Sequence, residues 1–292
     1  MKQGKYIAAV LSLYMAYGPA MAFAANTTTG SVGIVIEGDN NTVSSSNSIT
    51  LGNEISSLGG VNVAIGYGSK AGNQEQPLGP NNANGATAVG TVSQAVNYRA
   101  TALGDYTVAS GTDAIGIGTS AQATGDRSIS AGLLSEASGV NAIAIGDSSV
   151  SSSNDTVAIG EKAHATSSQS IAIGSASSSS GLYSVAIGLN AKATNGWSVA
   201  LGNGSETAAA VSTRTMAVGG RTYQTAGGTA RGTVSVGNEA VKRTITNVAA
   251  GRVTASSTDA INGSQLFAVT QSVDANTQNI AKVISDTTVK DG

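Results

Sequence analysis

The chain has 292 residues with 38 glycines, 4% aromatic and only 11% charged residues, a composition unusual for a globular enzyme. Charged residues make up roughly 25% of typical soluble domains. Disorder is a poor explanation, because valine and isoleucine are plentiful and regularly placed. The formal net charge is −2 without a cluster of lysine or arginine, which argues against nucleic acid as a partner because phosphate contacts need such clusters.

Residues 1–24 have the pattern of a secretory signal peptide. Lys2 and Lys5 precede an apolar run at 6–15, and the Ala-Phe-Ala sequence at 22–24 supplies a cleavage site. The apolar run is shorter than the roughly 20 residues that span a bilayer. A buried amino-terminal helix is the alternative, but the pattern favours export and a mature chain that begins at residue 25.

A tetrapeptide of apolar, small, apolar and glycine residues recurs along the chain. Its glycines fall at positions 38, 52 and 66, and then at 90, 104, 118, 132, 146, 160, 174, 188 and 202. Every step is 14 residues except the step of 24 between Gly66 and Gly90, and two looser copies end at Gly219 and Gly237. A repeat this regular predicts a solenoid.

Within each repeat, small and apolar residues alternate with the period of two that is typical of β-strands. A second alternating pair, such as Ala163 and Ala165, lies three and five residues after the glycine. Fourteen residues therefore predict two short strands and two tight turns, which is one coil of a flattened roll. Ordering costs about 1–2 kcal/mol per residue, so a lone coil is unstable and neighbouring coils must stabilise one another.

The alternation leads to an expectation about which side chains face inwards. Aliphatic residues such as Val185 and Ile187 recur too regularly to be exposed, so we expect them to fill the interior of the coil. The alanine between them, Ala186 in this repeat, would then point outwards. A column of such alanines would be a smooth surface that a second subunit could approach closely. The recurring glycine is expected at a corner that needs positive φ or close chain approach.

Breaks in the spacing predict the domain boundaries. The long step before Gly90 predicts an inserted loop at about 67–89, and the stretched spacing after Gly202 predicts the end of the roll. We therefore expect a β-roll head over residues 25–237.

A heptad pattern follows. Thr258 or Asp259 is expected to cap a helix, and the next apolar residues are spaced by alternating steps of three and four. Positions a and d of the heptad are occupied by Leu266, Val273 and Ile280, and by Val269, Asn276 and Val283. A helix packed on its own domain is the alternative. Asn276 favours a coiled coil, because a polar core residue fixes register and strand number at a cost in stability.

Three features together resemble the trimeric autotransporter adhesins, the YadA-like family. The 14-residue repeats resemble the left-handed parallel β-roll of the family head, and residues 273–280 (VDANTQNI) resemble its stalk pattern V-x-x-N-T-x-x-I. Residues 243–251 (RTITNVAAG) and 258–266 (TDAINGSQL) resemble its neck. Neck residues singled out by this resemblance are Arg243, Asn247, Gly251, Asp259 and Asn262.

The resemblance implies a mostly β, homotrimeric head, a neck at 238–262 and the start of a trimeric α-helical coiled-coil stalk at 263–292. It implies an adhesin that attaches a Gram-negative bacterium to host cells, extracellular matrix or other bacteria, exported and displayed at the cell surface and outer membrane. Membrane attachment is expected only through a C-terminal anchor absent from this chain. Three copies of Asn276 would face the trimer axis and could hold a chloride ion; no other cofactor is expected.

Two repeats resemble the motif that the family associates with collagen recognition, N-S-V-A-I-G-x-x-S. Residues 141–149 and 169–177 come closest, and each departs from it at the first or second position. The candidate ligand-binding residues are Asn141, Ser149, Ser170 and Ser177. Their partner would be a host matrix protein or a cell-surface receptor, bound through many weak copies.

No catalytic or metal-binding constellation is expected. The chain has no cysteine, and His164 is its only histidine, so one chain cannot assemble a metal site from several histidines. We expect His164 to be solvated, and Trp197 to be either a turn cap or an anchor for a partner. Alternatives to an adhesin are a carbohydrate-active β-solenoid enzyme and a structural or serum-protection fibre without a specific receptor. An ice-binding solenoid is set aside, because the outward positions form no Thr-x-Thr column.

Overall fold

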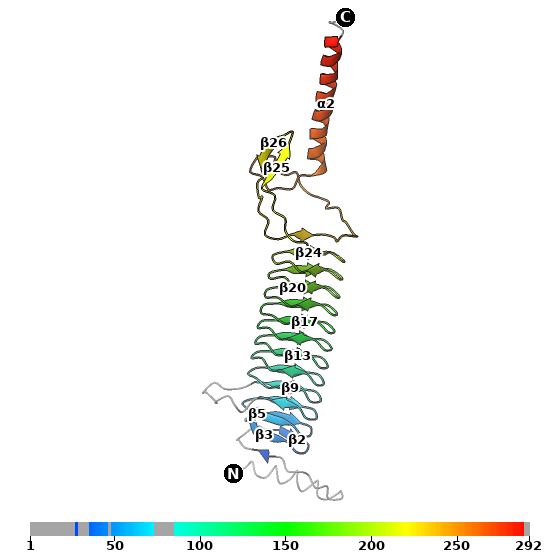
Figure 1. Ribbon diagram of the computed structural model, residues 1–292. Coiled ribbons are helices and arrows are strands. Elements are labelled where there is room, and N and C mark those ends of the chain that lie inside the picture. The colour runs from blue at the N-terminus through cyan, green and yellow to red at the C-terminus, as the bar shows by residue number, and fades with distance from the viewer. Residues whose placement is uncertain (1–26, 29–34, 46–47, 73–84, 289–292) are drawn as a thin grey trace, which may run out of the picture.

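The computed structural model describes residues 27–28, 35–45, 48–72 and 85–288. These residues form a long parallel β-roll, an irregular segment with one hairpin, and a helix that rises from the end opposite the N-terminus (Figure 1). The expected signal peptide lies outside the described residues.

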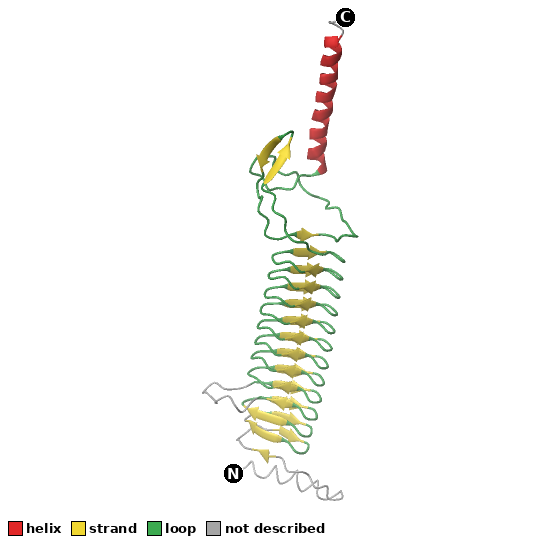
Figure 2. Ribbon diagram, in the orientation of Figure 1, coloured by secondary structure: helices red, strands yellow, loops and turns green. Residues whose placement is uncertain are grey.

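Each coil of the roll gives one strand to each of two parallel sheets (Figure 2). Sheet A contains β1 (Thr27–Thr28), β3 (Thr42–Ser45), β5 (Ser56–Gly59), β7 (Lys70–Ala71), β9 (Gln94–Ala95), β11 (Val108–Ala109), β13 (Gln122–Ala123), β15 (Glu136–Ala137), β17 (Val150–Ser151), β19 (His164–Ala165), β21 (Ser178–Ser179) and β23 (Lys192–Ala193). Sheet B contains β2 (Val35–Glu37), β4 (Ile49–Leu51), β6 (Val63–Ile65), β8 (Thr87–Val89), β10 (Thr101–Leu103), β12 (Ile115–Ile117), β14 (Ile129–Ala131), β16 (Ile143–Ile145), β18 (Val157–Ile159), β20 (Ile171–Ile173), β22 (Val185–Ile187), β24 (Val199–Leu201) and β27 (Val234–Ser235).

The register of the sheets follows the repeat. Ile159 pairs with Ile173, and His164 pairs with Ser178, each 14 residues further along. The predicted coil of two short strands and two turns is therefore confirmed. Beyond the roll, β25 (Thr215–Val218) and β26 (Arg221–Gln224) form an antiparallel hairpin, and α2 (Gly263–Thr288) forms the C-terminal helix.

Small side chains fill the roll. Ala158 and Ala172, at the centres of their strands, are fully buried, whereas the neighbouring Ile159 and Ile173 are 36% and 37% exposed. The expectation that aliphatic residues fill the interior while alanines face outwards is therefore wrong. The reason is the narrow space between the sheets. At the interior position Gly116, even an added Cβ would lie only 2.9 Å from Cγ2 of Thr107.

Serine and threonine share this interior with alanine. Hydroxyl pairs cross it from sheet to turn, as between Ser151 and Thr156 at 2.7 Å and between Ser179 and Ser184 at 2.6 Å. Buried polar groups are stable in such a core when they are hydrogen-bonded. From residue 86 onward the roll is thus held by backbone ladders and small side chains, whereas Val43 and Ile55 are buried in the earlier coils.

The recurring glycine lies at a corner, as expected. Gly146 has a φ of 129°, a conformation that other residues rarely adopt. A Cβ at this position would lie 2.5 Å from the carbonyl oxygen of Gly160 in the next coil. Both the backbone conformation and the close stacking of coils therefore require glycine.

The spacing of the repeat breaks before Gly90 and after Gly202, and the structure differs at these two places. The additional residues before Gly90 fall between β7 and β8, and 73–84 lie outside the described residues. The looser copy that ends at Gly237 supplies β27, which pairs with β24. The copy that ends at Gly219 is no coil: its residues form β25, so reading it as a repeat was wrong.

Candidate functional site

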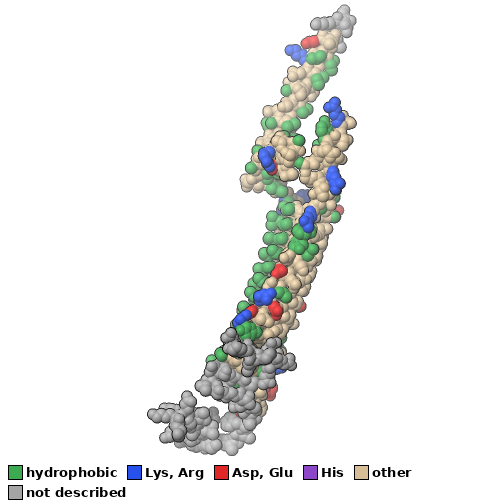
Figure 3. Space-filling model, turned by 90° about the vertical axis from the view of Figure 1, so that its left-hand side faces the viewer, with side chains coloured by type: hydrophobic (Ala, Val, Ile, Leu, Met, Phe, Trp, Pro, Cys, Tyr) green, Lys and Arg blue, Asp and Glu red, His purple; other side chains and the backbone are tan. Residues whose placement is uncertain are grey.

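An apolar face runs along the outside of sheet B. It consists of the first and third residues of strands β12, β14, β16, β18, β20, β22 and β24, all of them Val, Ile or Leu except Ala131 in β14. The third residues are the more exposed; Ile145 and Ile187, for example, are 40% and 37% exposed. Figure 3 shows hydrophobic side chains gathered along one edge of the roll. At about 4.8 Å per strand this face is about 30 Å long, and faces of this kind mark interaction sites.

The outside of sheet A is polar by comparison. Gln122, His164 and Lys192 are exposed on it. His164 lies in β19 and not in a turn. A column of exposed hydroxyl residues follows the sheet A strands, namely Thr124, Ser138, Ser152, Thr166, Ser180 and Thr194. The two sheets therefore present surfaces of different chemistry, one aliphatic and one polar.

A ladder of polar side chains lines the turn that leads into sheet B. Arg99 pairs with Asp113 in the next coil, and their hydrogen bond holds the pKa of Asp113 below its usual value. Further along, Nε of Arg127 donates to Oδ1 of Asn141 at 2.7 Å, and Nδ2 of Asn141 donates to Oδ1 of Asp155 at 2.8 Å. Asn141 is thus exposed and accessible to a ligand, as one rung of this ladder.

The other three candidate ligand residues lie inside the roll. Ser149, Ser170 and Ser177 are fully buried. Oγ of Ser149 donates to the carbonyl of Gly146, and Oγ of Ser177 donates to that of Gly174. They cannot contact a ligand on the outside, so their assignment is corrected. The error has the same cause as the wrong assignment of the interior. These serines occupy the inward-facing positions that alanine occupies in other repeats.

Trp197 contacts both an aromatic ring and a cation. The centre of its ring lies 4.2 Å from that of the tilted Tyr183 ring, and the guanidinium carbon of Arg231 lies 3.5 Å from it. Tyr183 belongs to the last full coils, whereas Arg231 precedes β27. Between the two alternatives, the stacking favours the cap, since it ties the last coil to the segment that follows.

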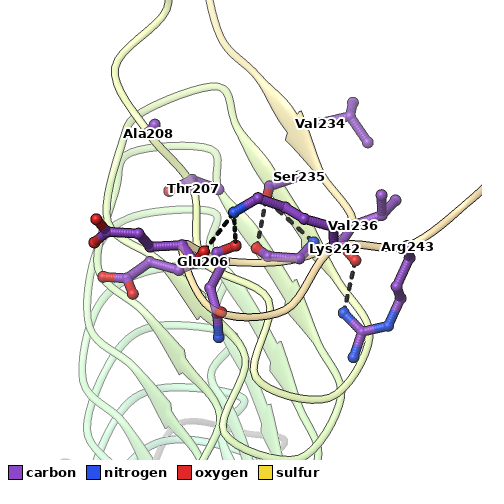
Figure 4. Close-up of a pocket in the computed structure, with 11 residues that line it drawn as sticks. Glu206, Thr207, Ala208, Val234, Ser235, Val236, Lys242 and Arg243 are labelled. Atoms are coloured by element: carbon purple, nitrogen blue, oxygen red, sulfur yellow. Dashed lines mark hydrogen bonds between the residues drawn. The ribbon is translucent and has the colours of Figure 1, made fainter.

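Arg243 joins the end of the roll to the neck. Its guanidinium donates to the carbonyls of Asn203 and Val236, at 2.5 and 2.6 Å, and to Oγ of Ser205 at 3.1 Å. Beside it lies an open hollow of about 660 Å³, which Glu206, Lys242 and Arg243 help to line (Figure 4). Nζ of Lys242 also donates to backbone carbonyls there. Both cations therefore serve to hold the chain.

The neck ends in a capping box. Oδ1 of Asn262 accepts from the backbone N–H of Gln265 at 3.3 Å, and Oε1 of Gln265 accepts from that of Asn262 at 3.2 Å. The expected cap at Thr258 or Asp259 was wrong, because a three-residue spacing from Asn262 to Gln265 satisfies both ends of the box. Asp259 instead pairs with Arg252 at 2.8 Å, which lowers the pKa of its carboxyl.

Two further neck residues have backbone roles. Gly251 exchanges two hydrogen bonds with the side-chain amide of Gln265, at 2.9 and 2.6 Å. A Cβ at Gly251 would lie 2.3 Å from the carbonyl of Ala260. Asn247 has a φ of 62°. The neck residues are therefore explained by chain geometry and capping.

The heptad seam of α2 is left uncovered by the other residues that the structure describes. Leu266, Val273 and Ile280 at a are 64%, 56% and 61% exposed, and Val269 and Val283 at d are 59% and 62% exposed. Asn276 is exposed as well. The alternative of a helix packed on its own domain is not observed over 263–288.

Neither a metal-ligand cluster nor a membrane-spanning helix is found in the described parts of the chain. Nowhere in them do three or more His, Cys, Asp or Glu side chains gather to hold a metal ion. None of the helices described there has the length and apolarity to cross a membrane.

Two family models match the chain, and together they cover more than half of it. "YadA head domain repeat (2 copies)" matches six stretches, at residues 82–107, 109–135, 137–163, 152–177, 165–191 and 179–205. "Coiled stalk of trimeric autotransporter adhesin" matches residues 244–289.

One curated relative and two solved structures are similar to parts of the chain. Autotransporter adhesin BtaE of Brucella suis biovar 1 (strain 1330) is 51% identical over 69 residues, which is 24% of this chain and 9% of that protein. The C-terminal YadA-like domain of BPSL2063 from Burkholderia pseudomallei is 53% identical, with a TM-score of 0.35, over 36% of this chain and 50% of that one. The collagen-binding domain of the Yersinia adhesin YadA is 29% identical, with a TM-score of 0.44, over 64% and 83%.

Proposed function

Because the chain belongs to the YadA-like family of trimeric autotransporter adhesins, we propose that three copies join to form the head and first stalk turns of a bacterial surface adhesin. The observation that carries the proposal is the apolar face of sheet B. It carries Val, Ile or Leu on each of seven successive strands, and the heptad seam of α2 is still more exposed. Covering each half-exposed aliphatic side chain contributes about 1 kcal/mol, at roughly 25 cal/mol per Å².

In such a trimer the polar side of the roll would be the adhesive surface. If sheet B faces the threefold axis, then sheet A with its hydroxyl column remains outside on all three copies. The partner we propose is a host matrix protein or cell-surface receptor, which the repeated surface binds through avidity. Among the candidate residues, Asn141 is the one whose side chain could take part, since it is exposed in the ladder.

Export and surface display complete the proposal. The amino-terminal pattern of charged, apolar and cleavage-site residues supports secretion, and the family supports display at the outer membrane of a Gram-negative bacterium. The matched relative is an adhesin.

Binding by the purified chain tests the adhesin proposal. We expect light scattering to give the mass of three chains, and the trimer to bind collagen-coated or host-cell surfaces. Half-saturation should occur at a concentration about 100-fold or more below that of a monomeric variant, since linked sites gain at least that much through avidity. A monomeric wild-type chain would contradict the assembly. A trimer that binds neither surface, at any concentration, would favour the fibre without a receptor.

We also propose a chloride ion at Asn276. In a trimer, three Asn276 side chains at position d would face the axis, and their amide N–H groups could donate to an anion. Buried amides without partners would cost about 1–3 kcal/mol each. Asn276→Ile is therefore expected to keep the trimer, to raise its melting temperature and to remove its dependence on chloride concentration. Loss of trimers in this variant, measured by light scattering, would contradict the proposal.

A further inference from the structure

The hairpin β25–β26 has an apolar face that the described part of its own chain leaves exposed. Met216 lies opposite Tyr223 and Val218 lies opposite Arg221, so these four side chains share one face. Met216, Val218 and Tyr223 are 54%, 52% and 49% exposed. The other face carries only small or polar side chains, at 215, 217, 222 and 224.

The hairpin falls between the two family matches, which end at residue 205 and resume at 244. A two-stranded hairpin alone is marginally stable in water at best. Its apolar face therefore requires a surface to pack against, and neither the head repeat nor the stalk match accounts for one.

The start of α2 offers that surface. Phe267 follows Leu266, so it occupies position b, where the coiled-coil seam cannot cover it, and it is 62% exposed. Asp274 occupies the same position one heptad later and is exposed. Within the described residues, neither Asp274 nor Arg221 has an ion-pair partner. The helix thus presents an apolar side chain and an unpaired negative charge. The hairpin presents an apolar face and an unpaired positive charge.

The two elements lie at the same height along the molecule. The hairpin stands level with the first turns of α2, with the turn that joins β25 to β26 at the end away from the roll (Figure 1). The space-filling view shows hairpin and helix as two separate prongs (Figure 3). In the proposed trimer, the helix of a neighbouring copy lies alongside the hairpin. That helix, and not the helix of the same chain, is therefore the surface that covers the apolar face of the hairpin.

We propose that the hairpin of each copy docks on the stalk helix of a neighbouring copy, with Met216 and Tyr223 against Phe267 and with Arg221 beside Asp274. The spacing fits: the two helix residues are about 10 Å apart along the axis at 1.5 Å per residue. On the hairpin, two residues span about 7 Å, and the long Arg221 side chain covers the rest. Three hairpins would form a collar around the stalk. This inference rests on the proposed trimer.

Cysteine cross-linking tests the collar, because the chain has no cysteine of its own. We expect the double variant Met216→Cys, Phe267→Cys, treated with a short bis-maleimide, to run as a covalent trimer on a denaturing gel. The matched control is Ala217→Cys, Phe267→Cys, whose hairpin cysteine lies on the opposite face. The control should give at least tenfold less covalent trimer.

The outcomes separate the collar from the trimer. Light scattering before cross-linking reports assembly; a monomer at that stage would overturn both proposals. A trimer that gives no covalent product would overturn the collar alone. Cross-links confined to single chains would show that the hairpin docks on its own helix, and equal yields from the two variants would show that docking has no preferred face. Both results contradict the inference.

Discussion

Ala144→Ile is expected to disrupt the roll around β16. Ala144 is fully buried between the two sheets, where the space is already closed at a single methyl group. Overpacking a filled interior costs about 1–3 kcal/mol, and occasionally more; the narrow gap between the sheets places this site at the upper end. Thermal denaturation followed by circular dichroism should show a clear fall in melting temperature.

The control for this change lies in the adjacent coil. Ala131 occupies the third position of β14, where neighbouring strands carry isoleucine, and it pairs in register with Ile145. Ala131→Ile therefore adds the same side chain to the outward face and is expected to leave the melting temperature unchanged or raised. If Ala144→Ile were tolerated and Ala131→Ile destabilised the roll, the interior would have been assigned to the wrong side chains.

The double variant Ile159→Asp, Ile173→Asp is expected to separate the subunits without unfolding the roll. These side chains are 36% and 37% exposed on the apolar face, so a single chain can keep the carboxylates in water. In a trimer they would be buried without partners, at several kcal/mol per ion. A loss of roughly 4 kcal/mol raises a dissociation constant about a thousandfold. Light scattering should show the mass fall to that of one 28.6 kDa chain.

His164→Asp with Ser178→Asp is the matched control. These residues also pair in register between neighbouring coils, but they lie on sheet A. Their replacement should leave the trimer intact and change only the polar surface. Dissociation by this pair, with an intact trimer in the sheet B variant, would place the subunit interface on the other sheet.

Much of the architecture could be predicted from the sequence because it depends on spacing alone. Glycines at intervals of 14 residues fixed the length of a coil, and alternation within each repeat identified two short strands. The steps of three and four from Leu266 to Val283 identified the helix and its seam. These patterns are local in the sequence. The backbone geometry of strands and helices that produces them does not depend on how the chain packs.

Spacing alone led to wrong assignments where the outcome depends on how the chain packs. Ser149, Ser170 and Ser177 matched positions in a binding motif, but a motif does not tell whether a side chain faces a ligand or the interior. The copy that ends at Gly219 matched the repeat in letters and still formed a hairpin. The helix cap moved to Asn262, because capping depends on which side chain reaches the free N–H groups.

The sequence by itself therefore determined the coil, the stacking and the stalk helix, since each follows from a period along the chain. Only the tertiary structure decided which side of the strand faces in. Alanine and isoleucine alternate with the same period, so the pattern defines two faces of each strand but does not tell which of them faces the interior. Which face lies inside depends on the distance between the two sheets; in the coils from residue 86 onward, an alanine side chain fills this gap and an isoleucine side chain does not fit it.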